Sequence, residues 1–335
     1  MSDQAATGTA RGGPGGDAGS ARVGTSPRLP AGVTDPATLA HALAAHDYLA
    51  DDGLATAAYL ALALRRPLFL EGDAGVGKTA IAQALATLTD GPLLRLQCYE
   101  GIDAAQALYD WNFPRQVLHL RSAEAAGRVQ LDADHDAAVA AQELEAELYD
   151  RRFLVARPIL QAIETPRAVL LVDEVDRADD EFEALLLEVL SEFSVSIPEL
   201  GTITAAEPPL VVLTSNRTRE VHDALKRRCY YHWVDHPDFD REVAIVRARM
   251  PEVGERLARE VVSAVQLLRE QDLLKPPGVA ETLDWTEALV ALGADHLDAA
   301  KATATLGSVL KFREDLERAR SLDVGEMVVR AVSGT

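Results

Sequence analysis

The hydrophobic residues of the chain follow two spacings that alternate along the sequence. Four short segments are predominantly apolar, at 68–71, 93–98, 167–174 and 209–216. Runs of this length predict strands, and the unbroken third run is typical of a strand buried on both faces of a parallel sheet. Elsewhere apolar residues recur every three or four positions, as in 80–88 and 179–193, which predicts amphipathic helices. The pattern therefore favours an α/β fold with a parallel sheet between helices.

Two further segments suggest additions to this sheet. Residues 194–204 alternate on either side of a Pro-Glu-Leu-Gly turn, which predicts a β-hairpin. Residues 99–128 contain the aromatic residues Tyr109, Trp111 and Phe113 and an alternating run at 116–121, and we interpret the segment as a helix that carries a short β insertion. We expect these aromatic residues to pack the insertion against the core, and the alternative is that they face a partner. The charged segment 133–152 has a helical period and predicts a solvated helix.

The two ends of the chain differ from the middle. Residues 1–32 are dominated by Gly, Ala, Ser, Thr and Pro, so we expect a disordered tail. Residues 237–335 have helical periodicity and predict a small all-helical lid domain, in which Asp284 caps a helix after the Pro-Pro-Gly break at 276–278. The α/β domain would then occupy residues 33–236.

The clearest functional motif of the sequence follows the first predicted strand. Gly72 to Thr79 read G-x-x-x-x-G-K-T between the apolar run and a helix, which is a P-loop. Its glycines let backbone N–H groups converge on phosphates, and the helix N-terminus adds its positive dipole. Lys78 would reach the β- and γ-phosphates. The residues expected to contact the nucleotide are Gly72, Asp73, Ala74, Gly75, Val76, Gly77, Lys78, Thr79 and Ala80.

Two of the other predicted strands end in polar residues. Asp173 and Glu174 end the third apolar segment, and Asn216 ends the fourth. Ligands of a parallel sheet bind at the carboxyl ends of its strands, so these groups should lie beside the phosphates. We assign Asp173 and the Thr79 hydroxyl to Mg²⁺, and Glu174 to orienting and deprotonating the attacking water. Asn216 would hydrogen-bond the γ-phosphate or that water.

Composition narrows the class of partner. With 33 basic and 53 acidic residues the formal charge is −20, which argues against nucleic acid as a partner. The only two cysteines, Cys98 and Cys229, do not indicate a disulfide framework. No apolar run reaches the roughly 20 residues of a membrane span, and no signal peptide is evident. We therefore expect a cytoplasmic protein.

The most basic stretch of this acidic chain follows the fourth strand. Lys226, Arg227 and Arg228 stand together at the predicted end of a helix. They either cap that helix or deliver a positive charge to the phosphates of a neighbouring subunit.

Taken together, these elements resemble the AAA+ ATPases over about residues 37–322. The insertion, the run Asp173–Ala178 and the hairpin at 196–203 look like the MoxR branch. Within that branch, the segments 108–112, 214–220 and 275–282 are similar to ATPases associated with the maturation of carbon monoxide dehydrogenase and other molybdenum hydroxylases.

The resemblance implies roles for individual residues. Gly72 to Thr79 would form the Walker A loop, and Asp173 and Glu174 would form the Walker B pair. Asn216 would be the first sensor. Arg228 would be an arginine finger that acts on a neighbouring subunit, and Arg227 is the alternative residue for this role. A finger in trans implies a homo-oligomeric ring, commonly a hexamer. The second-sensor arginine is missing, since the corresponding segment, 279–286, contains an acidic residue and no arginine.

The function implied by the resemblance is chaperone-like remodelling of a client protein, driven by Mg-ATP hydrolysis. The client would be a molybdenum-containing metalloenzyme, assisted by a von Willebrand factor A domain protein. Two alternatives remain open: a nucleotide-gated scaffold ring with incidental hydrolysis, and a helicase or DNA motor. A GTPase is disfavoured because no N-K-x-D run follows any strand.

Overall fold

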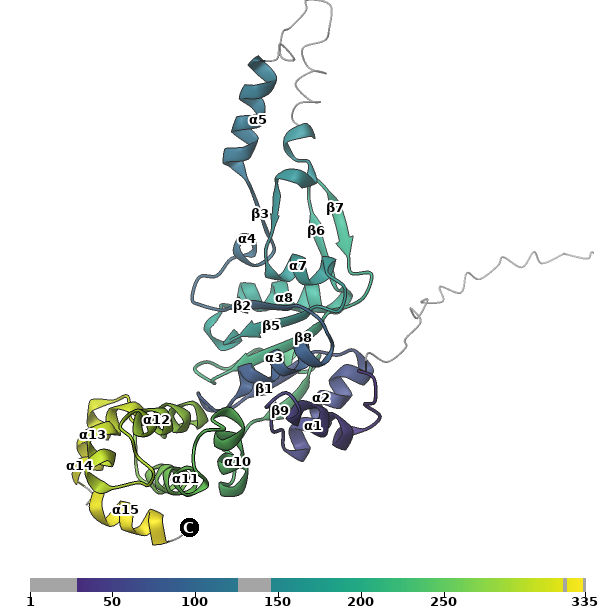
Figure 1. Ribbon diagram of the computed structural model, residues 1–335. Coiled ribbons are helices and arrows are strands. Elements are labelled where there is room, and N and C mark those ends of the chain that lie inside the picture. The colour runs from purple at the N-terminus through teal and green to yellow at the C-terminus, as the bar shows by residue number, and fades with distance from the viewer. Residues whose placement is uncertain (1–28, 126–145, 322–323, 334–335) are drawn as a thin grey trace, which may run out of the picture.

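A five-stranded parallel sheet lies at the centre of the α/β part of the chain (Figure 1). The computed structural model describes residues 29–125, 146–321 and 324–333. Residues 1–28 of the predicted tail lie outside the described residues, as does most of the helix predicted at 133–152. The sheet has the order β2-β5-β8-β1-β9. Its strands are β1 (Leu68–Glu71), β2 (Leu93–Gln97), β5 (Val169–Asp173), β8 (Leu210–Ser215) and β9 (Tyr230–Trp233).

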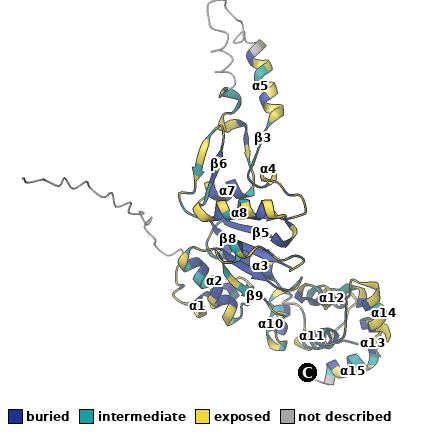
Figure 2. Cartoon of the chain, turned by 180° about the vertical axis from the view of Figure 1, so that it is seen from behind, coloured by how far each residue is buried: buried dark blue, intermediate teal, exposed yellow. Residues whose placement is uncertain are grey.

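Hydrophobic cores cover both faces of this sheet, as the unbroken apolar strands predict. Every residue of β5 and β8 is buried, and Figure 2 shows the central strands in dark blue between helices. One core includes residues of α1 (Pro36–Ala44), α2 (Asp52–Leu64) and α3 (Lys78–Leu88). The other includes residues of α7 (Pro158–Glu164) and α8 (Asp180–Glu192). The predicted α/β fold is therefore confirmed.

An elongated extension leaves one end of the sheet (Figure 1). It contains the predicted hairpin, β6 (Ser194–Ile197) with β7 (Gly201–Thr204), and an insertion that the sequence predicts only in part. The insertion consists of α4 (Ala104–Ala107), β3 (Tyr109–Trp111), α5 (Phe113–Ala125), the 3-10 turn η1 (Arg151–Phe153) and β4 (Leu154–Ala156). Its β part is the antiparallel pair of β3 and β4.

The strand expected from the alternation at 116–121 is wrong, because these residues lie within α5. The local start signal outweighs the alternation: the Asn112 side chain accepts the backbone N–H of Arg115 at 3.1 Å, and Pro114 follows the helix start. The alternating Val117 and Leu118 are both exposed, so no buried face fixes a strand register there.

The C-terminal part is entirely helical within the described residues. Its core surrounds Trp285, whose indole N–H donates to Thr305 at 2.7 Å. The chain enters it after β9. The α/β part also contains η2 (Val175–Arg177), which follows β5, and α9 (Asp223–Lys226), which precedes β9. The helices of the C-terminal part are α10 (Phe239–Arg249), α11 (Glu255–Arg269), α12 (Val279–Ala291), α13 (Ala299–Val309), α14 (Arg313–Ser321) and α15 (Val324–Ser333).

One prediction in this part needs correction. Asp284 lies inside α12 and caps nothing, because the helix begins five residues earlier. Its start is stabilised by Glu281, whose carboxylate accepts the backbone N–H of Gly278 at 2.9 Å. None of the helices in the described ranges is long and apolar enough to span a membrane.

Candidate functional site

The P-loop joins β1 to α3 with backbone geometry that requires glycine. Gly77, at the N-cap of α3, has φ 96°, and Gly72 has φ 158°. A Cβ atom on Gly72 would lie 2.3 Å from the carbonyl oxygen of Val234, so the loop packs directly on the chain after β9. The loop therefore presents backbone N–H groups and a helix N-terminus to one enclosed volume.

Lys78 is buried at the base of this loop. Its ammonium group donates to the carbonyl oxygens of Gly72, at 2.7 Å, and Asp73, at 2.6 Å. Burial lowers the pKa of Lys78, and nearby carboxylates led by Asp73 oppose this shift. An ammonium group has three donors, so one N–H remains for a phosphate oxygen.

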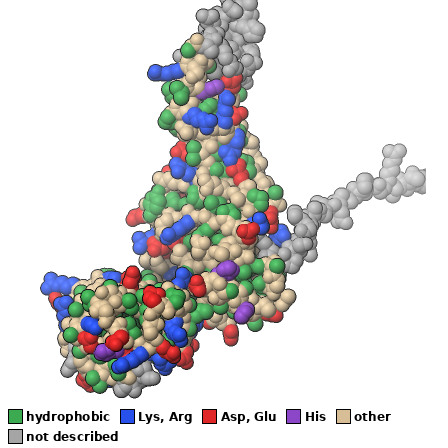
Figure 3. Space-filling view, viewed as in Figure 1, with side chains coloured by type: hydrophobic (Ala, Val, Ile, Leu, Met, Phe, Trp, Pro, Cys, Tyr) green, Lys and Arg blue, Asp and Glu red, His purple; other side chains and the backbone are tan. Residues whose placement is uncertain are grey.

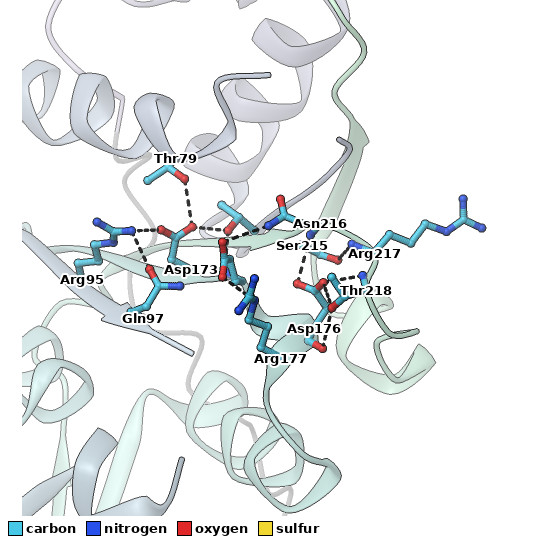
Figure 4. Close-up of polar contacts among 12 residues, drawn as sticks. Thr79, Arg95, Gln97, Asp173, Asp176, Arg177, Ser215, Asn216, Arg217 and Thr218 are labelled. Atoms are coloured by element: carbon cyan, nitrogen blue, oxygen red, sulfur yellow. Dashed lines mark hydrogen bonds and ion pairs between the residues drawn. The ribbon is translucent and has the colours of Figure 1, made fainter. Parts of the chain in front are cut away.

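Asp173 ends β5 next to the start of α3, with its carboxylate almost fully buried. One oxygen, Oδ1, accepts from the Thr79 hydroxyl at 3.1 Å and from the Thr214 hydroxyl at 2.6 Å (Figure 4). The other, Oδ2, pairs with Arg95 on β2 at 2.5 Å. The carboxylate is therefore held by three elements beside the first turn of α3.

Glu174 has a different environment although it is the next residue. Its left-handed backbone, with φ 54°, turns the side chain away from Asp173. Its Oε1 accepts from the Asn216 amide at 3.1 Å, and its Oε2 pairs with Arg177 at 2.8 Å (Figure 4). The two neighbouring carboxylates thus face different partners, which permits different roles.

A cavity of about 420 Å³ connects these groups. The predicted residues Lys78, Thr79, Asp173, Glu174 and Asn216 all line it. Its volume falls within the range of small-molecule sites, roughly 300–1,000 Å³. Its wall also includes apolar side chains from the segment before α2 and from the C-terminal helices, which are Tyr48, Leu49, Ile245, Val279 and Leu283.

The start of α12 closes the cavity at the P-loop. The backbone N–H of Ala280 donates to the carbonyl of Gly75 at 3.2 Å. A Cβ atom on Gly278 would lie 2.8 Å from the backbone of Ala74 and Gly75. No arginine occurs in this segment, whose Glu281 caps its own helix, as described above.

Arg227 and Arg228 lie apart from this cavity, which neither of them lines. Both are exposed, at the turn between α9 and β9. Arg227 pairs with Asp223 at 3.3 Å. For the Arg228 guanidinium, no ion pair or hydrogen bond is found among the described residues.

Sequence reasoning missed three residues of the site. Arg95 and Thr214 contact the Asp173 carboxylate, and Arg177 contacts the Glu174 carboxylate. Arg95 reaches the site through sheet register, because β2 pairs in parallel with β5 and its Gln97 lies opposite Asp173. The Arg177 contact depends on the left-handed turn at Glu174, for which the sequence offers no signal.

Comparison with known proteins agrees with this architecture. Residues 67–229, just under half of the chain, match the family model of the AAA domain (dynein-related subfamily). No curated protein matches the sequence significantly.

Two solved structures from Thermotoga maritima are similar to the chain. The RuvB Holliday junction branch migration motor shares 15% identity over 84% of this chain and 70% of that chain, with a TM-score of 0.42. Domain III of the replication initiation protein DnaA shares 14% identity over 80% of this chain and 96% of that chain, with a TM-score of 0.44. These likenesses are too weak to carry an argument about function. The fold is identified by the parallel sheet, the P-loop and the family match, which together show an AAA+ P-loop fold over residues 67–229. The chain is therefore an ATPase.

Proposed function

We propose that the chain uses Mg-ATP hydrolysis to remodel or mature a client protein, as a MoxR-type AAA+ ATPase that works in a homo-oligomeric ring. The observation that carries the proposal is the division between two adjacent carboxylates. Asp173 is bound to Thr79 at the start of α3, whereas Glu174 is bound to Asn216 at the same cavity. This is the arrangement that a metal ligand and a water-activating base require.

The donor set fits Mg²⁺. A threonine hydroxyl and a carboxylate lie 3.1 Å apart, and hard oxygen ligands of this kind suit magnesium. Within the described residues, no group of three or more His, Cys, Asp or Glu side chains could hold a metal ion alone. Magnesium sites commonly combine one or two carboxylates with substrate phosphates and water. When bound, the ion would neutralise charge on the phosphates.

The remaining residues then have defined tasks. The P-loop from Gly72 to Ala80 would hold the phosphates through its backbone, and Lys78 would donate to the β- and γ-phosphate oxygens. Glu174 would take the proton of the attacking water, which Asn216 orients. Arg228 would approach the γ-phosphate of a neighbouring subunit, and Arg227 is its rival for this role. The ring would most simply be a hexamer.

The nature of the client rests on the resemblance of the motifs alone. On that basis we propose a molybdenum-containing metalloenzyme as client and a von Willebrand factor A domain protein as partner. The exposed hydrophobic residues of α5, Phe113, Val117 and Leu118, are available on the extension for such a protein partner.

Nucleic acid is the less favourable alternative. The formal charge is −20, and on the face drawn in Figure 3 Lys and Arg are interspersed with Asp and Glu without forming a continuous basic stripe. Adding single- or double-stranded DNA should leave ATP turnover unchanged. A DNA-stimulated turnover would favour a DNA motor instead.

The Glu174→Gln variant tests the proposed chemistry. We expect it to bind ATP with near-normal affinity and to lose turnover by roughly 10²–10⁴-fold, because a general base is removed and the shape is retained. Nucleotide affinity and single-turnover hydrolysis measure the two effects. The matched control is Glu181→Gln, an exposed glutamate in the first turn of α8. Normal hydrolysis by the Glu174 variant would remove this residue from its role.

A client assay separates the remodelling machine from a scaffold. A remodelling ATPase should hydrolyse ATP faster when its client is added, whereas a scaffold with incidental hydrolysis should not respond. The Glu174→Gln variant, loaded with ATP, should also retain the client long enough for affinity capture. A ring that binds the metalloenzyme without any stimulation of turnover would support the scaffold.

A further inference from the structure

Strand β1 is linked by side chains to the turn that bears Arg228. The link at its beginning is Arg66, two residues before the strand. The Arg66 guanidinium donates to the carbonyl oxygens of Arg227, at 2.8 Å, and Arg228, at 3.2 Å. It also lies 5.3 Å from the centre of the Tyr230 ring. These contacts fix the backbone of the turn relative to the first residue of the strand.

The link at the other end is Glu71, the last residue of β1 and the residue before Gly72. Its side chain is only 5% exposed. One oxygen, Oε2, accepts from the Tyr231 hydroxyl at 3.0 Å and pairs with Lys226 at 3.4 Å. Lys226 is the last residue of α9 and directly precedes the two arginines. A buried charge therefore connects the start of the P-loop with the start of the arginine turn.

Stability alone does not account for this carboxylate. The other oxygen of Glu71, Oε1, is buried and has no hydrogen-bond partner within the described part of the chain. Burying a carboxylate with an unsatisfied oxygen costs free energy that a hydrophobic residue of similar size would not cost. The pair with Lys226 does, however, specify one position of the turn relative to the P-loop.

We propose that Glu71 is a positioning residue that couples the P-loop of one subunit to the arginine finger that the same subunit gives to its neighbour. The inference rests on the proposed ring with Arg228 as finger. Gly72 directly follows Glu71, so a shift of the loop around bound phosphates moves the Glu71 carboxylate. Through Lys226, that shift reaches the turn of Arg228. Nucleotide in one site would thereby adjust hydrolysis in the next.

Complementation between two inactive subunits tests the coupling. The first subunit carries Arg228→Ala, so its site is intact and its finger is lost. The second carries Glu174→Gln, so its finger is intact and its site is inactive. Mixed rings should recover turnover only where an intact site meets an intact finger. Adding Glu71→Gln to the second subunit should then reduce the recovered turnover by on the order of 10²-fold, the typical cost of misplacing a catalytic group by about 1 Å.

Because Glu71→Gln is placed in the second subunit, the experiment distinguishes a positioning role of Glu71 from a structural role in its own P-loop. In the second subunit, Glu71 belongs to a site that is already inactive, so a local defect in its P-loop cannot lower turnover. Arg66→Ala in the same subunit should act in the same direction. Arg256→Gln, which breaks a pair with the buried Glu260 in the helical part, is the control and should leave recovery unchanged. Co-purification of differently tagged subunits verifies assembly.

The outcomes are distinct. Loss of recovery with Glu71→Gln in assembled rings supports the coupling. Full recovery with Glu71→Gln overturns it, whatever the result for Arg66→Ala, and leaves the ring and the finger intact. No recovery even from the two parent variants would refute the trans-acting finger itself, and the coupling with it.

Discussion

At the scale of single residues, Thr214 is central to the site although it contacts no substrate in the proposed mechanism. Its hydroxyl donates to Asp173 at 2.6 Å and accepts the backbone N–H of Glu174 at 2.9 Å. One buried hydroxyl therefore orients both carboxylates. Its position at the end of β8, directly beside β5, makes this double contact possible.

We expect Thr214→Val to destabilise the fold by about 1–3 kcal/mol, because it leaves the backbone N–H of Glu174 without its hydrogen-bond partner and removes one of the hydrogen bonds to the buried Asp173 carboxylate. The variant should also lower magnesium affinity or turnover by roughly 10–100-fold, since a supporting hydrogen bond to the metal carboxylate is lost. Thermal unfolding and a Mg²⁺ titration of nucleotide binding measure the two effects. Thr214→Ser keeps the hydroxyl and should stay close to the parent; equal losses in both variants would contradict this account.

His236 lies under the P-loop and links stability to pH. Its Nε2 is 3.6 Å from the Asp73 carboxylate, and its buried Nδ1 has no hydrogen-bond partner in the described ranges. Burial, followed by the charge of Arg269, lowers the pKa of His236 below its ordinary value of 6.5. The unfolded chain therefore binds a proton at a higher pH than the folded chain, and stability falls as the pH drops below 6.5.

Unfolding curves measured between pH 7.5 and about 5.5 test whether stability falls on acidification. His236→Gln should reduce the loss of stability on acidification. It should not abolish the loss, because burial also lowers the pKa of His232. A His236 variant with an unaltered slope would show that this group is not responsible.

At the scale of elements, the contact between α12 and the P-loop depends on the absence of a side chain at Gly278. We expect Gly278→Ala to push the helix away from the loop, since the new Cβ would lie 2.8 Å from backbone atoms that cannot swing aside. Overpacking of this kind costs about 1–3 kcal/mol, and nucleotide affinity should fall with it.

Gly254→Ala is the matched control. Gly254 is also an N-cap glycine without a side-chain cap, at the start of α11, but its Cβ position has nothing within 4 Å. Nucleotide affinity and thermal stability should therefore stay near those of the parent. Equal affinity in the two variants would mean that the helix does not need to approach the loop.

An element could be predicted from the sequence when its signal lies within a few neighbouring residues. The P-loop and the strands that end in Asp173 and Ser215 were predictable because unbroken apolar runs and a motif of fixed spacing act within a few residues. The strand β4 was not, because it pairs with β3 across more than 40 residues of chain. The helix at 116–121 was missed for a local reason, because two local signals conflict there and the start signal at Asn112 outweighs the alternation. Arg95 entered the site through sheet register, which a single sequence does not reveal.

At the scale of the whole molecule, the separation of Arg228 from its own cavity decides what kind of assembly to expect. A group that lies outside its own site can stabilise the transferring phosphoryl only in another subunit. ATP turnover per subunit should then rise with protein concentration as rings form by mass action. Measuring specific activity together with molecular mass across a dilution series, with Mg-ATP present, tests this directly.

Arg228→Ala should remain slow at every concentration, because an arginine finger contributes roughly 10³–10⁵-fold to turnover. It should bind ATP normally, since Arg228 does not line its own cavity. Arg227→Ala removes only an exposed pair with Asp223 and should retain most of the activity. The reverse ranking of the two variants would transfer the finger to Arg227. Full turnover by monomers at high dilution would contradict a shared site altogether, because each chain would then complete its own catalytic centre.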